Sequence, residues 1–112
     1  MSLSIQARPV ENALVLVLSG KMTIGDSVMA LHAAVKEHVA AGDKHIILDM
    51  RDVTYVDSAG LGVLVTSLTC ARQAGGTLRL ANVPRRVQDL LDVSTLYMVF
   101  QIIELADAPP EG

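Results

Sequence analysis

The sequence of 112 residues is poor in aromatic side chains. It has no tryptophan, two tyrosines and one phenylalanine. This scarcity argues against a stacking platform for single-stranded nucleic acid, because such platforms seat bases on exposed aromatic rings. Basic residues are also in the minority, nine against twelve acidic ones, and the formal net charge is −3. Since nucleic-acid binding relies on a basic face, the charge disfavours that function as well.

Cysteine and long apolar runs are equally scarce. Cys70 is the single cysteine, so neither a disulfide framework nor a thiolate metal cluster is expected, and a reducing compartment, the cytoplasm, is favoured. The longest unbroken apolar run, Ala13–Leu18, is far shorter than the roughly 20 residues of a membrane-spanning helix. The first residues lack the basic region and apolar stretch of a signal peptide, so none is expected.

Aliphatic residues supply the core instead. Hydrophobic residues make up 51% of the chain, and valine, leucine and isoleucine dominate among them. This composition excludes a disordered chain, and the length fits one domain. We therefore expect a single domain over residues 1–112, with residues 108–112 as a flexible tail.

The apolar segments predict alternating strands and helices. Strands are expected at Leu3–Pro9, Ala13–Leu18, His45–Met50, Thr77–Ala81 and Val99–Ile103, and helices from Thr23 to about Ala41, from Ser58 to Ala74 and from Pro84 onward. The segment Arg51–Asp57 is expected to be a polar loop. Strands separated by helices pair in parallel, whereas the first two, joined by a short turn, pair antiparallel. The predicted fold is α/β, with a mixed four- to five-stranded sheet packed with three to four helices.

Two helix starts carry local signals. Thr23 and Asp26 have the spacing of a capping box, which predicts Thr23 as the N-cap of the first helix. Pro84 is expected at the first position of the third helix. Ser58 opens the second helix after an acidic residue, and a serine at that place is commonly an N-cap.

The segment Asp57–Gly62 is the most informative part of the sequence. It follows a buried strand, and ligand sites of α/β sheets concentrate beyond the carboxyl ends of strands. Glycine in a helix costs up to ~1 kcal/mol relative to alanine, so Gly60 and Gly62 suggest that something approaches this turn closely. Ser58 thus has two interpretations: it is an ordinary cap, or it is a serine that another molecule contacts.

The run Asp57-Ser58-Ala59-Gly60-Leu61-Gly62, with Leu48-Asp49 before it and Gly75-Gly76-Thr77-Leu78 after it, resembles the STAS domain. The resemblance extends from Gly20 to Phe100 and is strongest with stand-alone bacterial anti-sigma-factor antagonists. It implies a STAS-like fold and a regulatory protein that is not an enzyme and needs neither cofactor nor metal. In that family, the serine matching Ser58 is phosphorylated by an anti-sigma factor that is itself a serine kinase. The unphosphorylated antagonist binds this kinase, and a serine phosphatase resets the switch.

The resemblance also implies a partner-binding surface. It comprises Thr23, Ile24, Gly25, Asp26, Tyr55, Asp57, Ser58, Ala59, Gly60, Leu61 and Gly62, with Ser58 as the phosphate acceptor. The chain departs from the family pattern at two places. Ala59 follows the serine where Ser or Thr is frequent, and Lys21 stands where an acid often follows the glycine of the second strand.

Other functions remain as alternatives. STAS domains also serve as unphosphorylated subunits of lipid-transport and other complexes, and Ser58 would then be only a cap. Nucleotide binding lacks a Walker-type loop, and a serine hydrolase lacks the G-x-S-x-G setting. A receiver domain needs an acidic pair where this chain has Ser19-Gly20-Lys21. Asp49 and Asp52 are expected to bind loop amides rather than a metal ion.

Overall fold

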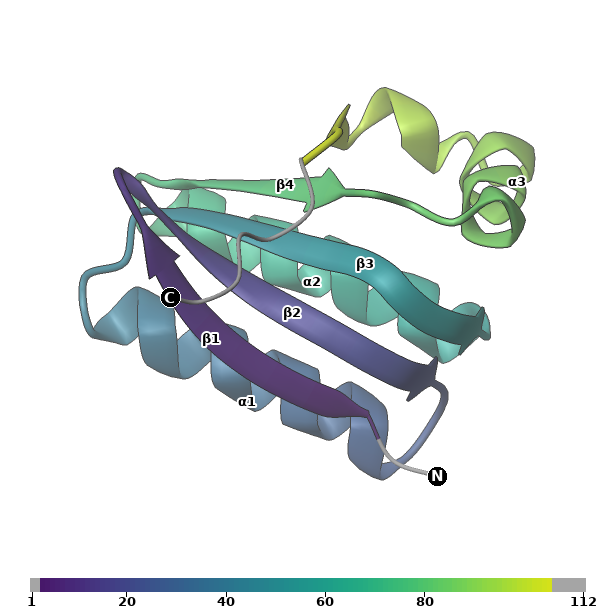
Figure 1. Cartoon of the computed structure of the whole chain (residues 1–112), viewed down its shortest axis with the longest axis horizontal. Helices are drawn as coiled ribbons and strands as arrows, with labels where there is room; N and C mark the ends of the chain where they lie inside the picture. Colours follow the sequence, from purple (N-terminus) through teal and green to yellow (C-terminus); the bar gives the residue numbers. More distant parts are fainter. Residues whose placement is uncertain (1–2, 106–112) are drawn as a thin grey trace.

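The computed structural model describes residues 3–105, and its centre is a mixed five-stranded sheet (Figure 1). The strands, in spatial order, are β1 (Ser4–Val10), β2 (Ala13–Met22), β3 (His45–Val56), β4 (Thr77–Ala81) and β5 (Gln101–Ile103). β1 pairs antiparallel with β2, and all other neighbours are parallel. The helices are α1 (Asp26–Ala40), α2 (Ser58–Gln73) and α3 (Arg85–Val93), followed by a 3₁₀ turn at Leu96–Met98. The predicted α/β fold and mixed sheet are confirmed.

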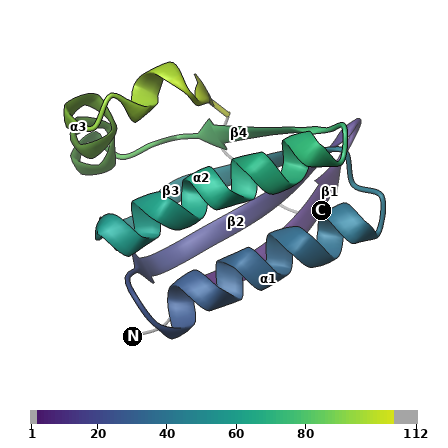
Figure 2. The ribbon, with the colours of Figure 1, turned by 180° about the vertical axis from the view of Figure 1, so that it is seen from behind.

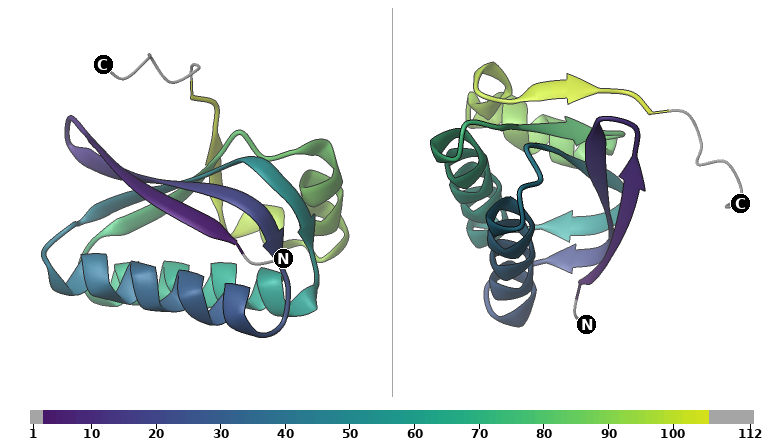
Figure 3. Two further views of the ribbon diagram at one scale, coloured as in Figure 1. Left: turned by 60° about the horizontal axis from the view of Figure 1, so that its bottom comes forward. Right: turned by 90° about the vertical axis from the view of Figure 1, so that its left-hand side faces the viewer.

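The main core lies between the sheet and the pair α1 and α2, which run side by side across one face (Figures 2 and 3). Alternate residues of the parallel strands enter it, for example Leu16, Leu48 and Leu80, all fully buried. The helices contribute residues such as Leu31 and Leu64, also fully buried. Each such side chain stabilises the fold by about 1.5–3 kcal/mol relative to an exposed one.

The opposite face of the sheet carries a smaller apolar cluster. Val15, Ile47 and Ala81 are buried there, and Leu105 packs against them. Because β2 and β3 bury residues on both faces, their centres read as unbroken apolar runs rather than as an alternating pattern. α3 lies beyond the carboxyl end of β4, and Val87 joins the main core.

The predicted loop at Arg51–Asp57 is wrong, because β3 continues to Val56. β2 is also longer than predicted and reaches Met22, so the two extensions pair with each other in parallel. Val53 and Val56 are buried while the residues between them are exposed. The register shifts along β2 interrupt the alternation, which is why the polar residues of this segment looked like a loop.

The predicted helix starts also need correction. The N-cap of α1 is Gly25 rather than Thr23. The Ser27 hydroxyl replaces the capping box: it accepts a hydrogen bond from the Thr23 amide at 2.9 Å and donates to the Thr23 carbonyl oxygen at 2.7 Å. Pro84 precedes the first helical residue of α3 and serves as its N-cap.

The end of the chain differs from the prediction at one point. The last strand begins at Gln101 rather than Val99, because the 3₁₀ turn takes up the preceding residues. The predicted tail, residues 108–112, lies outside the described residues. Within residues 3–105, every helix is too short or too polar to cross a lipid bilayer.

Candidate functional site

The site forms where the loop between β2 and α1 meets the first turn of α2. Asp57 holds the two together, because one carboxylate oxygen accepts a hydrogen bond from the Ile24 amide at 2.9 Å and the other from the Gly60 amide at 2.8 Å. The Asp57 amide donates in turn to the Met22 carbonyl oxygen at 3.2 Å. The hydrogen bonds from Ile24 and then Gly60 hold the pKa of the Asp57 carboxyl below its usual value.

Asp57 is therefore the N-cap of α2, and the prediction of Ser58 as a cap is wrong. Ser58 is the first helical residue and is exposed. Its hydroxyl makes no hydrogen bond with another residue in the described part of the chain. The capping role is thus filled by the neighbouring carboxylate, which leaves the Ser58 hydroxyl open to another molecule.

The two glycines of this helix start have different environments. A Cβ atom at Gly60 would overlap the Met22 carbonyl oxygen and lie 2.8 Å from Cγ1 of Val56. The close approach inferred at Gly60 is therefore made by this chain's own strand. At Gly62, which is exposed, a Cβ atom would meet nothing within 4 Å.

The structure brings two predicted segments together: Thr23–Asp26 and Asp57–Gly62 are joined by the hydrogen bond between Ile24 and Asp57. The Ile24 side chain is large and apolar, yet it is 79% exposed. Gly60 is buried and so offers no surface, whereas Tyr55 is exposed on β3 next to Lys21 of β2. The exposed members of the predicted surface are Ile24, Gly25, Asp26, Tyr55, Ser58 and Gly62.

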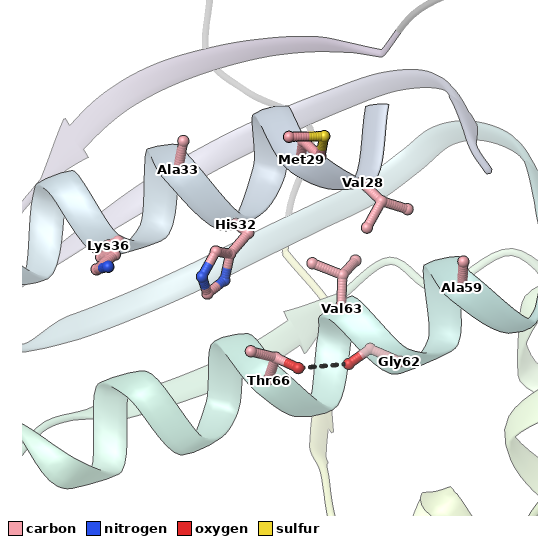
Figure 4. A pocket seen from close by; sticks show the side chains of 9 residues that line it. All are labelled: Val28, Met29, His32, Ala33, Lys36, Ala59, Gly62, Val63 and Thr66. Carbon is pink, nitrogen blue, oxygen red and sulfur yellow. Dashed lines mark hydrogen bonds between the residues drawn. The ribbon is translucent and has the colours of Figure 1, made fainter. Parts of the chain in front are cut away.

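A groove between α1 and α2 begins at this site, and it was not predicted from the sequence. It has a volume of about 600 Å³ and is lined by Val28, Met29, His32, Ala33, Lys36, Ala59, Gly62, Val63 and Thr66. Figure 4 shows Val28 and Val63 pointing toward each other and His32 reaching from α1 toward α2. Met29 was the available signal: it falls outside the apolar stripe of α1 and is 69% exposed.

Metal ligation is not supported by the acidic residues. Within residues 3–105, no group of three or more His, Cys, Asp or Glu side chains is placed to hold a metal ion. Asp49 instead accepts hydrogen bonds from the Arg51 amide at 3.1 Å and from Nδ2 of Asn82 at 3.2 Å. Its predicted role toward a backbone amide is confirmed.

Comparison with known proteins places this arrangement in a family. The family model described as "Mlab, STAS domain" matches residues 5–101. The anti-sigma-B factor antagonist of Bacillus subtilis (strain 168) is 28% identical over 102 residues, which cover 91% of this chain and 92% of the relative.

Two solved structures have the same fold. An anti-sigma factor antagonist from Mycobacterium paratuberculosis has a TM-score of 0.79 at 19% identity, covering 95% of this chain and 89% of that one. The phosphorylated form of the Bacillus cell fate determinant SpoIIAA has a TM-score of 0.72 at 17% identity, covering 93% of each chain. Because the family model spans most of the sequence, this chain belongs to the STAS-domain family.

Proposed function

We propose that this STAS domain is an anti-sigma-factor antagonist that works by partner switching. Unphosphorylated, it binds an anti-sigma factor that is also a serine kinase, and phosphorylation of Ser58 releases it. A serine phosphatase restores the binding form. The observation that carries the proposal is the exposed hydroxyl of Ser58 on the first turn of α2, which has no hydrogen-bond partner among residues 3–105 and is therefore accessible to a kinase.

The electrostatics of the helix start support this role. A phosphate on Ser58 would add roughly −1.5 to −2 charges, and a helix N-terminus tolerates such a group. The amides of Ile24 and Gly60 are already engaged by the Asp57 carboxylate, so the phosphate would add charge beside a carboxylate without taking over those donors. A hundredfold loss of affinity corresponds to only about 2.8 kcal/mol, within reach of one buried like-charge contact.

The relatives support the same proposal. The Bacillus subtilis relative, similar along nearly its whole length, is named as an antagonist of an anti-sigma factor. SpoIIAA, which shares the fold, has been solved in a phosphorylated form. Phosphorylation is thus compatible with this architecture, and no large refolding is needed for the switch.

The test is a phosphorylation assay with a serine-kinase anti-sigma factor encoded in the same genome. We expect ATP-dependent transfer of one phosphate to the wild-type chain, mapped to Ser58 by mass spectrometry, and none to Ser58→Ala. Thr69→Ala, which removes another exposed hydroxyl of α2, is the matched control and should be phosphorylated normally. Full phosphate uptake by Ser58→Ala would refute the assignment.

The alternative outcome is an unphosphorylated subunit of a lipid-transport or other multiprotein complex. In that case the wild-type chain would take up no phosphate, and Ser58→Glu would leave its complex intact. Transporter components encoded beside the gene, in place of a kinase, would point the same way.

A further inference from the structure

We propose that the groove between α1 and α2 receives a short segment of the anti-sigma factor that carries aliphatic side chains and at least one carboxylate. This inference rests on the proposed function and deepens it, because it names the chemistry of the partner's contact. Four observations carry it: the shape of the groove, its charge, its continuity with Ser58 and the open space at Gly62.

The shape fits a segment of protein chain. The lining residues of α1 extend from Val28 to Lys36, which corresponds to about 12 Å of helix. Val28, Met29 and Val63 give the groove apolar walls, and Met29 is 69% exposed. Apolar surface gathered in one groove is typical of protein contact sites.

The charge of the groove selects the occupant. Two basic residues line it, His32 and Lys36, and no acidic residue among those described does so. The whole chain carries a formal net charge of −3, so the groove lining is more basic than the chain as a whole. A carboxylate on the occupant would pair with the Lys36 side chain.

The groove is continuous with the phosphorylation site. Ser58, Gly62 and Thr66 are spaced four residues apart and therefore share one face of α2, and both Gly62 and Thr66 line the groove. A phosphate on Ser58 would stand at the mouth of the groove. It would repel an acidic occupant, which gives the release step a physical cause.

Packing against the described residues does not require a glycine at position 62. Alanine is the better helix former, and a Cβ atom at Gly62 would meet nothing within 4 Å. Gly62 lines the groove, so a side chain at this position would narrow it. This makes Gly62 a sensitive position for a test.

The experiment measures binding of the unphosphorylated chain to the purified serine-kinase anti-sigma factor by titration calorimetry. Gly62→Leu fills the groove and Lys36→Glu reverses its charge, and we expect each to weaken binding at least tenfold. Arg72→Glu, an equal charge reversal near the far end of α2 and outside the groove, should bind within twofold of the wild type. Circular dichroism and urea unfolding confirm that each variant is folded.

The outcomes separate this inference from the proposed function. If Ser58 of the wild type is phosphorylated but Gly62→Leu and Lys36→Glu bind as tightly as the wild type, the groove assignment is overturned while the proposed function stands. If the wild type neither binds nor is phosphorylated, both are overturned. If sedimentation shows a wild-type dimer that Gly62→Leu dissociates, the occupant is a second copy of the chain and the inference is again overturned.

Discussion

Alanine at Gly60 and alanine at Gly62 should change stability in opposite directions, although the two positions are only two residues apart in α2. At Gly62 the new methyl group meets nothing, so the gain in helix propensity remains, about 0.5–1 kcal/mol. At Gly60 the methyl group would overlap the Met22 carbonyl oxygen and crowd Val56. Overpacking of this kind costs about 1–3 kcal/mol, and the obstacle is strand backbone, which yields less easily than a side chain.

The two effects can be combined into one expected difference. For Gly60→Ala we take the upper end of the steric cost, about 3 kcal/mol, because the obstacle is backbone. The propensity gain of up to ~1 kcal/mol then leaves a net loss of about 2 kcal/mol. The two variants should therefore differ by about 3 kcal/mol in free energy of unfolding. For a domain of this size, that difference corresponds to roughly 10 °C in Tm.

Urea unfolding followed by circular dichroism measures the difference directly. With a slope of about 1–3 kcal/mol per molar urea, the two midpoints should lie roughly 1–3 M apart, with the wild type between them. Equal midpoints for the two variants, or a Gly60→Ala variant as stable as the wild type, would refute the reasoning. Either result would mean that the first turn of α2 does not pack against β2 at Gly60.

Three further predictions follow from the same site and its surroundings. The pKa of Asp57 is lower in the folded state, so its carboxylate stabilises the fold at pH values above the unfolded pKa. This stabilisation is lost as the pH falls through the folded pKa. Asp57→Asn should therefore lower the urea midpoint at pH 7 but change it little at acid pH, below the folded pKa. The Asn82 side chain donates a hydrogen bond to Asp49 and accepts one from the Leu105 amide at 2.9 Å. Asn82→Ala should therefore lower the free energy of unfolding, measured with urea, by about 1–3 kcal/mol. An unchanged free energy of unfolding would contradict this pairing. Enzymatically phosphorylated wild type should bind the kinase at least a hundredfold more weakly than the unphosphorylated chain, and equal affinities would contradict the switch.

The register of β3 shows where reasoning from sequence failed. Its first half, with Ile46 and Leu48, has the continuous apolar character of a buried strand and was predicted correctly. Its second half contains only Val53 and Val56 as buried positions, and they fit no regular alternation. The pairing partner that turns this half into a strand is the extension of β2, about thirty residues earlier in the chain, which local pattern does not reveal.

The capping of α2 shows the same limit at smaller scale. Serine and aspartate are both good N-cap residues, so the pair Asp57-Ser58 leaves the cap undecided. The structure chooses Asp57 because its second carboxylate oxygen also reaches the Ile24 amide, 33 residues away along the chain. Because Asp57 is the cap, the Ser58 hydroxyl has no hydrogen-bond partner in the part of the chain that the structure describes.

By itself, the sequence determined the class of the fold, the order of its elements and the position of the informative turn. These follow from apolar periodicity and glycine positions, which are local properties, and from the length of the chain. Only the tertiary structure decided which glycine faces the chain's own strand and which faces open space, and that α1 and α2 leave a groove with a basic edge beside Ser58. These features depend on distances between residues that are far apart in sequence, and such distances are set by packing rather than by local pattern.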